Sequence, residues 1–146
     1  MRAPAPALSS VAGLASLAAV VLGGCGGIVS PDLFLVERSG STPGAKLTLL
    51  INEEGGVRCD GGPERKLSDP QIVQARALQE ELKVPAESRL ELAPGAGSVL
   101  RYRVRDENGT VSYADDSKGQ PKVLRNMALF VLQVAESVCR LPQQGA

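Results

Sequence analysis

The sequence contains no histidine and no tryptophan among its 146 residues, and its 16 basic and 16 acidic side chains cancel. The absence of histidine removes the commonest general base near neutral pH, every Ser-His or Cys-His nucleophile pair and most zinc sites. The absence of a basic surplus argues against a nucleic-acid partner, because phosphate binding draws its affinity from positive charge. We therefore expect a protein that is not an enzyme, holds no metal or cofactor and binds no nucleic acid.

The first 24 residues have the layout of a secretory signal peptide. Arg2 supplies a charged start, and the 15 residues at 8–22 form a short run of apolar and small side chains. The competing interpretation is an uncleaved membrane span, which needs about 20 predominantly apolar residues. Prolines before the run and glycines after it make this segment a poor span, so the pattern favours a signal peptide at 1–24.

The apolar run ends in Leu22, Gly23, Gly24 and Cys25. A branched apolar residue and two small residues before a cysteine resemble the lipobox of bacterial lipoproteins, and the mature part of the chain resembles a family of small bacterial lipoproteins. The resemblance implies that the Cys25 sulfur receives a diacylglycerol, that the chain is cut before Cys25 and that the protein is anchored on the extracytoplasmic face of the cell membrane. Two acyl chains suffice for stable attachment. Residues 25–31 would then be the lipidated cysteine and a tether of at most about 20 Å.

We expect residues 32–142 to form a single domain, followed by a short tail at 143–146. A mature chain of this size buries about two thirds of its unfolded surface and needs no metal to fold. Removal of residues 1–24 takes away one charged side chain, Arg2, and leaves a net charge of about −1.

Alternating apolar residues predict three strands in the first part of the domain, at 33–38, 46–53 and 57–59. A three-residue loop at 54–56 would pair Ile51 with Cys59. This register places Val57 and Cys59 on the apolar face of the sheet. Leu90 and Leu92 predict a further short strand after the first helix.

Capping signals predict where the first helix begins. Ser68 and Gln71 fit a capping box, Pro70 fits the first turn, and an apolar stripe at helical spacing follows. Pro85 is expected to end this helix. A second apolar stripe predicts the main core helix over residues 121–140.

Asn108 and Gly109 give the strongest hairpin signal in the chain, between strands at 99–107 and 110–115. A two-residue turn there would set Tyr102 opposite Asp115. The predicted element order is thus β-β-β-α-β-β-β-α, which indicates an α+β domain with an antiparallel sheet of about four to six strands covered by two helices.

The odd number of cysteines becomes informative once Cys25 is assigned to lipid, because Cys59 and Cys139 then remain. Disulfides persist in the compartment where an exported domain resides. Cys59 ends a strand that faces the core, and Cys139 lies near the end of the helix expected to cover that sheet. We therefore expect a disulfide between them.

Two surfaces are candidates for binding a partner, which we expect to be a protein. The first, here called the arginine strip, lies on the hairpin face opposite the apolar residues and consists of Arg101, Arg103 and Arg105. It is either a solvated face balanced by nearby acids or a docking strip for an acidic protein or for anionic lipid head groups. The second is the 39–45 loop, whose small residues permit close approach. Its candidate contact residues are Ser39, Gly40, Ser41, Thr42, Pro43 and Gly44.

Short motifs follow one another over residues 36–132: Val36-Glu37-Arg38-Ser39-Gly40 with Gly44, Tyr102-Arg103-Val104, Val111 with Asp115, and Pro121 with Leu124. Together they resemble emfourins, small protein inhibitors of thermolysin-like metalloproteases. The chain departs from that family in its lipid anchor, its cysteine pair and Ser41, where a second glycine is expected. The resemblance implies inhibition by an inserted loop, with the 39–45 loop in that role.

Two functions therefore emerge as expectations. The first is a lipid-anchored extracytoplasmic binding module without catalytic activity. The alternative is an emfourin-like protein inhibitor of a secreted metalloprotease.

Overall fold

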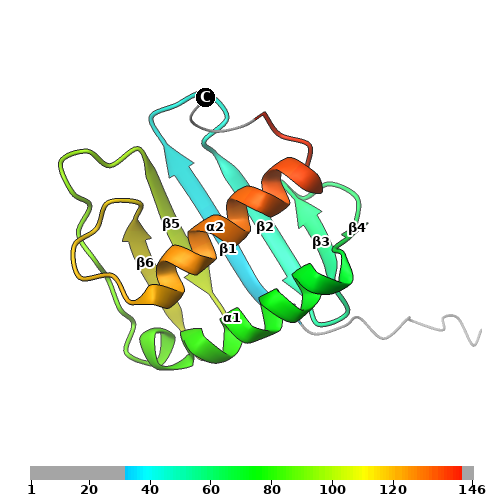
Figure 1. Ribbon diagram of the computed structural model, residues 1–146, viewed down its shortest axis with the longest axis horizontal. Helices are drawn as coiled ribbons and strands as arrows, with labels where there is room; N and C mark the ends of the chain where they lie inside the picture. Colours follow the sequence, from blue (N-terminus) through cyan, green and yellow to red (C-terminus); the bar gives the residue numbers. More distant parts are fainter. Residues whose placement is uncertain (1–31, 143–146) are drawn as a thin grey trace, which may run out of the picture.

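The computed structural model describes residues 32–142. The predicted signal peptide, the lipid attachment at Cys25, the tether and the C-terminal tail lie outside the described residues. Six antiparallel strands form one sheet, and two helices lie side by side over one of its faces (Figure 1). The strands are β1 (Asp32–Gly40), β2 (Leu47–Asn52), β3 (Gly56–Cys59), β4 (Arg65–Lys66), β5 (Leu100–Arg105) and β6 (Thr110–Ala114). The helices are α1 (Asp69–Glu87) and α2 (Lys122–Ser137).

The strand order across the sheet is β4-β3-β2-β1-β5-β6, so the first strand of the chain lies in the middle. The α+β class and the helix-covered antiparallel sheet are as predicted. The element order differs, because the fourth strand precedes α1. Strand β4 pairs its two residues with Gly56 and Val57, and two residues are too few for an alternation that sequence reading could detect.

The segment predicted as a strand at Leu90 and Leu92 forms a single parallel bridge instead. Glu91 lies beside Ser112 of β6, whose backbone exchanges hydrogen bonds of 2.9 Å with Leu90 and Leu92. Pro94, two positions after Leu92, has no N–H to extend the ladder, so the pairing stops after one bridge. This short contact nevertheless fixes the segment 91–94 along the outer edge of β6.

The first hairpin keeps its predicted faces but pairs two residues away from the predicted register. Ile51 lies opposite Val57, not Cys59. The Asn52 side-chain oxygen accepts hydrogen bonds from the backbone N–H groups of Glu54 (3.1 Å) and Gly56 (2.7 Å), which starts the loop one residue earlier than expected. Gly55, with a φ of 76°, is then the left-handed residue that closes the turn.

The second hairpin differs from prediction for the same reason. The Asp106 side chain accepts hydrogen bonds from the N–H groups of Asn108 (2.8 Å) and Gly109 (3.0 Å), so the loop has four residues, not two. Tyr102 therefore faces Tyr113, and the two rings stack with centroids 5.1 Å apart. Because the shift is again by two, the apolar and arginine faces stay where they were predicted.

Helix α1 begins as predicted but does not end at Pro85. The Ser68 N–H donates to the Gln71 side chain (3.0 Å), which is one half of the capping box. The helix continues to Glu87 although Pro85 lacks one N–H donor. The burial of Ala86, which is 2% exposed and packs into the core, offsets that loss. Arg89, with a φ of 51°, then ends the helix in a left-handed turn.

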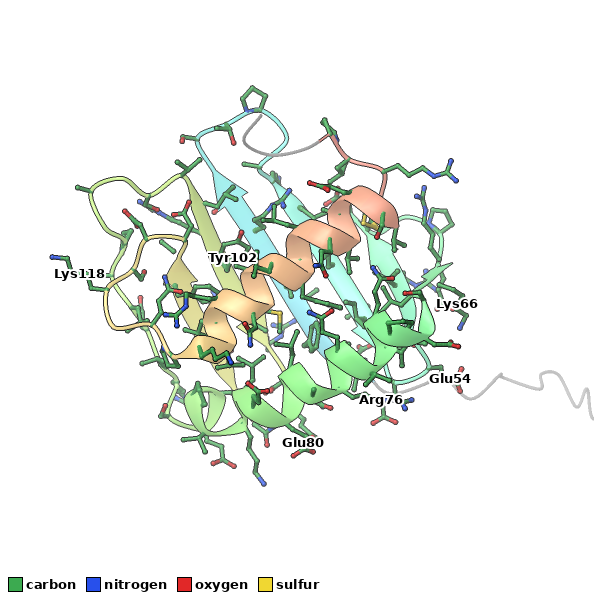
Figure 2. All side chains as sticks on the ribbon, in the orientation of Figure 1. Glu54, Lys66, Arg76, Glu80, Tyr102 and Lys118 are labelled. Carbon is green, nitrogen blue, oxygen red and sulfur yellow. A yellow bond between two sulfur atoms is a disulfide. The ribbon has the colours of Figure 1, made fainter. Side chains whose placement is uncertain are left out.

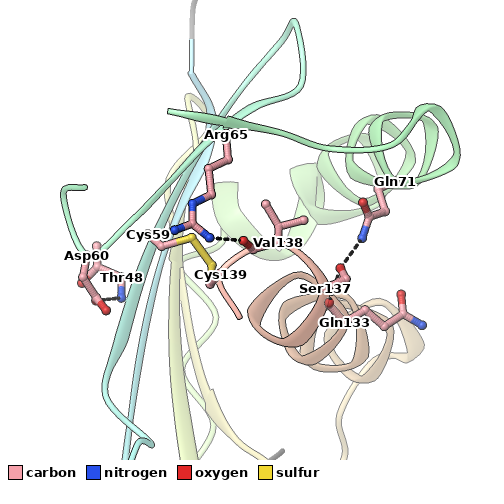
Figure 3. Close-up of a disulfide and its surroundings, with 9 residues drawn as sticks. All are labelled: Thr48, Cys59, Asp60, Arg65, Gln71, Gln133, Ser137, Val138 and Cys139. Atoms are coloured by element: carbon pink, nitrogen blue, oxygen red, sulfur yellow. Dashed lines mark hydrogen bonds between the residues drawn. A yellow bond between two sulfur atoms is a disulfide. The ribbon is translucent and has the colours of Figure 1, made fainter. Parts of the chain in front are cut away.

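The core lies between the sheet and the helices. Phe34 of β1 and Phe130 of α2 are both fully buried and meet edge to face with centroids 6.1 Å apart. A disulfide joins Cys59, at the end of β3, to Cys139, just after α2, as predicted (Figure 3). Next to it, an Arg65 N–H donates to the Val138 carbonyl, so β4 and the end of α2 are also joined by a hydrogen bond.

Candidate functional site

The sheet has one face covered by helices and one bare face, and the two faces differ sharply in composition. Side chains that alternate with the core residues of β1 and β5 project onto the bare face. Glu37 lies beside Arg103, and Ser39 lies beside Arg101, in direct cross-strand register. Farther along the same strands, Leu35 lies beside Arg105. The predicted arginine strip is thus on the bare face, next to the strand that leads into the 39–45 loop.

An open groove of about 620 Å³ lies on this bare face. Strands β1, β2, β5 and β6 contribute to it, and the segment 91–94 contributes Glu91, Leu92 and Pro94 along one side. The sequence could not show this wall, because it exists only where Glu91 bridges to β6. Arg101, Arg103, Ser39 and Gly40 line the groove, whereas residues 41–44 and Arg105 do not. Arg105 lines a smaller hollow with Asp32 near the start of β1.

The charges of the groove are incompletely paired. The Arg103 Nε atom lies 4.0 Å from a Glu37 carboxylate oxygen, and both side chains are more than half exposed. Among residues 32–142, no hydrogen bond or ion pair involves the side chain of Lys46 or Arg101, and both line the groove. The hydroxyl residues Thr48 and Ser112 lie in the same cross-strand row as Glu37 and Arg103. This combination can bind a partner through charge and hydrogen bonds.

The 39–45 loop projects from the end of β1 and is exposed from Ser39 to Gly44. Its shape is held by its own backbone, because Ala45 N–H donates to Thr42 O (3.1 Å) and Gly44 adopts a φ of 76°. Ser41 N–H donates to Val99 O (3.3 Å), which ties the loop to the chain before β5. The loop is therefore exposed and ordered at the same time.

Arg38 fastens the loop from beneath, and sequence reading did not single out its role. Its Nε donates to Ala45 O (2.8 Å) and another nitrogen donates to Gly44 O (3.2 Å). The residue is only 2% exposed, so burial lowers the pKa of its guanidinium, an effect partly opposed by Tyr102 and Asp60. The alternation of Phe34, Val36 and Arg38 was the available signal, because it places this arginine on the covered face.

On the covered face, Tyr102 lies beside Arg38 and Tyr113 lies on the far side of Tyr102 (Tyr102 is labelled in Figure 2). Burial raises the pKa of both phenols. The Tyr113 hydroxyl has no hydrogen-bond partner among the described residues. These rings form the apolar support under the strand that carries Arg101 and Arg103.

Asp115 and Asp116 position the chain between the groove wall and β5. The two Asp116 oxygens accept the N–H groups of Gly95 (2.8 Å) and Gly97 (2.9 Å). An Asp115 oxygen accepts the Leu100 N–H (3.1 Å), at the start of β5. The two carboxylates thus accept hydrogen bonds from the neighbouring backbone. Together with the bridge at Glu91, these bonds hold the groove wall in place.

Comparisons with protein-family models, with curated proteins and with solved structures find no match to this chain. Within residues 32–142, neither helix is long and apolar enough to cross a membrane. The same part of the chain contains no group of three or more acidic, histidine or cysteine side chains that could hold a metal ion. The groove and the 39–45 loop are therefore the features from which function is inferred.

Proposed function

We propose that this chain is a lipid-anchored, non-enzymatic binding module on the extracytoplasmic face of the membrane. The observation that supports binding is the groove on the bare face of the sheet, which brings unpaired cations beside an ordered, exposed loop. The proposed anchor rests on the lipobox-like residues before and at Cys25. The proposed lack of catalysis rests on the missing histidine and on the pairing of Glu37, one of the two acids that line the groove, with Arg103 at 4.0 Å.

The direction of β1 favours a protein partner over lipid head groups. The strand has nine residues, so its ends lie about 26 Å apart at ~3.3 Å per residue. A tether would enter at Asp32, whereas the 39–45 loop and Arg101 lie at the opposite end of the strand. An anchored domain can therefore present this end away from the bilayer.

The anchor is tested by mass spectrometry of the chain purified from its own membrane. We expect an N-terminus at Cys25 that carries a diacylglycerol, and we expect Cys25→Ala to remain uncleaved and unlipidated. Cys59→Ser with Cys139→Ser serves as the control, because it removes the other two cysteines without touching the lipobox-like residues. An unmodified, uncleaved N-terminus in the wild-type chain would contradict the proposal.

The binding role is tested by crosslinking the anchored chain in its own membrane and comparing variants. A partner should be captured by the wild type and by Lys83→Glu on the exposed side of α1, but not by Arg101→Glu. Capture of the same proteins by all three chains would contradict a role for the groove.

The second candidate function is emfourin-like inhibition of a secreted metalloprotease. The hydrogen bonds that hold the exposed 39–45 loop favour it, because a loop already held in one shape loses less entropy when it inserts into a cleft. Gly44→Val should abolish inhibition of a thermolysin-like protease, since valine is strained at a φ of 76°. Gly119→Val is the matched control, because Gly119 has a φ of 71° in another exposed loop. The absence of inhibition by the wild-type chain at micromolar concentration would exclude this function.

A further inference from the structure

We infer that the groove binds an extended polypeptide segment that carries acidic side chains at alternate positions. This inference rests on the proposed binding role and specifies the chemistry of the partner. It follows from the charge of the bare face, from the unpaired cations in the groove and from the spacing of Arg101 and Arg103.

The groove carries a small surplus of positive charge although the whole chain is balanced. The exposed cations that line it are Lys46, Arg101 and Arg103. Glu37 on β1 and Glu91 in the wall are the acids that line the groove. The two helices on the opposite side carry five acidic and four basic side chains, so their charges nearly cancel. The cations of the groove therefore attract an acidic partner, whereas the helix side offers no comparable surplus of positive charge.

Lys46 and Arg101 are available for new contacts without breaking existing ones. Neither side chain has a hydrogen bond or ion pair within residues 32–142, whereas Arg103 faces Glu37 at 4.0 Å. A carboxylate that enters the groove can form a bidentate pair with a guanidinium, which is stronger than a neutral hydrogen bond. The desolvation cost is small because the groove is open to water.

The shape and spacing of the groove favour an extended chain over a bilayer. Arg101 and Arg103 project from the same face of β5 about 7 Å apart, which is also the spacing of alternate side chains in an extended partner. The wall at 91–94 borders the groove on one side, which suits a single extended chain better than a flat layer of lipid head groups. Thr48 and Ser112 can meanwhile hydrogen-bond to a partner's backbone.

The inference is tested with two fluorescein-labelled peptides of equal composition and charge. In one peptide glutamate alternates with serine, and in the other the glutamates form one block. Anisotropy is measured against the full chain in uncharged detergent micelles at low salt. We expect the alternating peptide to bind about tenfold more tightly than the block peptide, since adjacent side chains of an extended strand point to opposite faces.

Charge-reversed variants show where the peptide binds. Arg101→Glu with Arg103→Glu should weaken binding of the alternating peptide by more than about tenfold. The matched control is Lys83→Glu with Lys118→Glu, in α1 and in the loop after β6. It changes the net charge by the same amount as the test variant and should leave binding unchanged. Circular dichroism of both variants verifies that the fold is intact.

Three outcomes would overturn the inference. The first is equal weakening by both double variants, which would mean non-specific attraction. The second is equal affinity for the two peptides. The third is the absence of peptide binding together with Arg101-dependent binding to vesicles that contain phosphatidylglycerol, which would identify a lipid surface instead. Failure of the proposed anchor is distinguishable from failure of this inference, because an unlipidated Cys25 would leave the peptide result unchanged.

Discussion

Two arginines on neighbouring strands show how differently the two faces of the sheet use the same side chain. Arg38 of β1 is 2% exposed on the covered face and holds two backbone carbonyls of the 39–45 loop. Arg103 of β5 has a side chain that is 62% exposed on the bare face and lies 4.0 Å from Glu37. The covered face uses its charge to stabilise a loop, and the bare face keeps its charge accessible. Substitutions should therefore reduce stability on one face and binding on the other.

The largest expected effect is on the covered side, at the disulfide. Cys59→Ser with Cys139→Ser removes a crosslink over 80 positions and should lower the free energy of unfolding by about 4 kcal/mol in the chain-entropy model. Urea unfolding followed by circular dichroism measures the change. Reductant should bring the wild type to the same midpoint as the variant. Coincident midpoints of the oxidised wild type and the variant would refute this role.

The next effect concerns Arg38. Arg38→Met keeps a long side chain in the core but loses two hydrogen bonds from a charged donor, at a cost of about 2 kcal/mol. The backbone N–H of Ala45 should exchange faster with solvent, because the loop loses its support. Arg38→Lys, which keeps the charge but has no planar fork, should recover part of the loss. Unchanged exchange at Ala45 would show that the loop is held by its backbone alone.

The tyrosines of the covered face predict a loss of stability in alkali. Burial raises the pKa of Tyr102 and Tyr113, so the unfolded phenols ionise near pH 10 while the folded ones do not. Their contribution is fully present below pH ~10 and is lost as the pH rises above that value. Tyr113→Phe should reduce this loss. At neutral pH it should change stability by less than about 1 kcal/mol, because the hydroxyl it removes has no partner among the described residues.

Tyrosinate absorbance measures this directly, since the chain contains two tyrosines and both are buried. In the native protein the absorbance should rise together with unfolding as the pH increases. A rise at the ordinary pKa in a chain that circular dichroism shows to be folded would contradict the burial argument.

The smallest expected effect is on the bare face. Arg103→Met removes an exposed ion pair and should change stability by less than about 0.5 kcal/mol, because solvent and salt screen such pairs. Arg38→Met should lower the free energy of unfolding several times more than Arg103→Met, so the two variants form a matched pair. A loss at Arg103 as large as that at Arg38 would break the distinction between the faces.

Much of the fold could be predicted from the sequence because alternation and helical spacing record which side of an element is buried. The arginine face of β5, the apolar face of β3 and the pairing of Cys59 with Cys139 all depend on this pattern. Strand registers could not be predicted as well, because hydrogen bonds accepted by the side chains of Asn52 and Asp106 decide where each loop begins. Such a bond changes the pairing by two residues and leaves the apolar pattern unaltered.

The candidate site was predictable in part. The arginine strip and the 39–45 loop were identified as separate surfaces, and the structure unites Arg101 and Arg103 with Ser39 and Gly40 in one groove. The wall at 91–94 required a tertiary contact with β6, and sequence patterns within one segment do not encode such contacts. The role of Arg38 depends in the same way on the distance between its side chain and the loop carbonyls.

The central position of β1 has a consequence for how the chain reaches this fold. As the chain is made, β2 follows β1 closely, but the other partner of β1, β5, arrives about 60 to 70 positions later. Until then one edge of β1 exposes unpaired N–H and C=O groups beside the apolar side chains of Phe34 and Val36. Such an edge can template aggregation. The incomplete sheet therefore offers an edge for wrong pairing that the finished domain, in which β5 covers this edge of β1, does not.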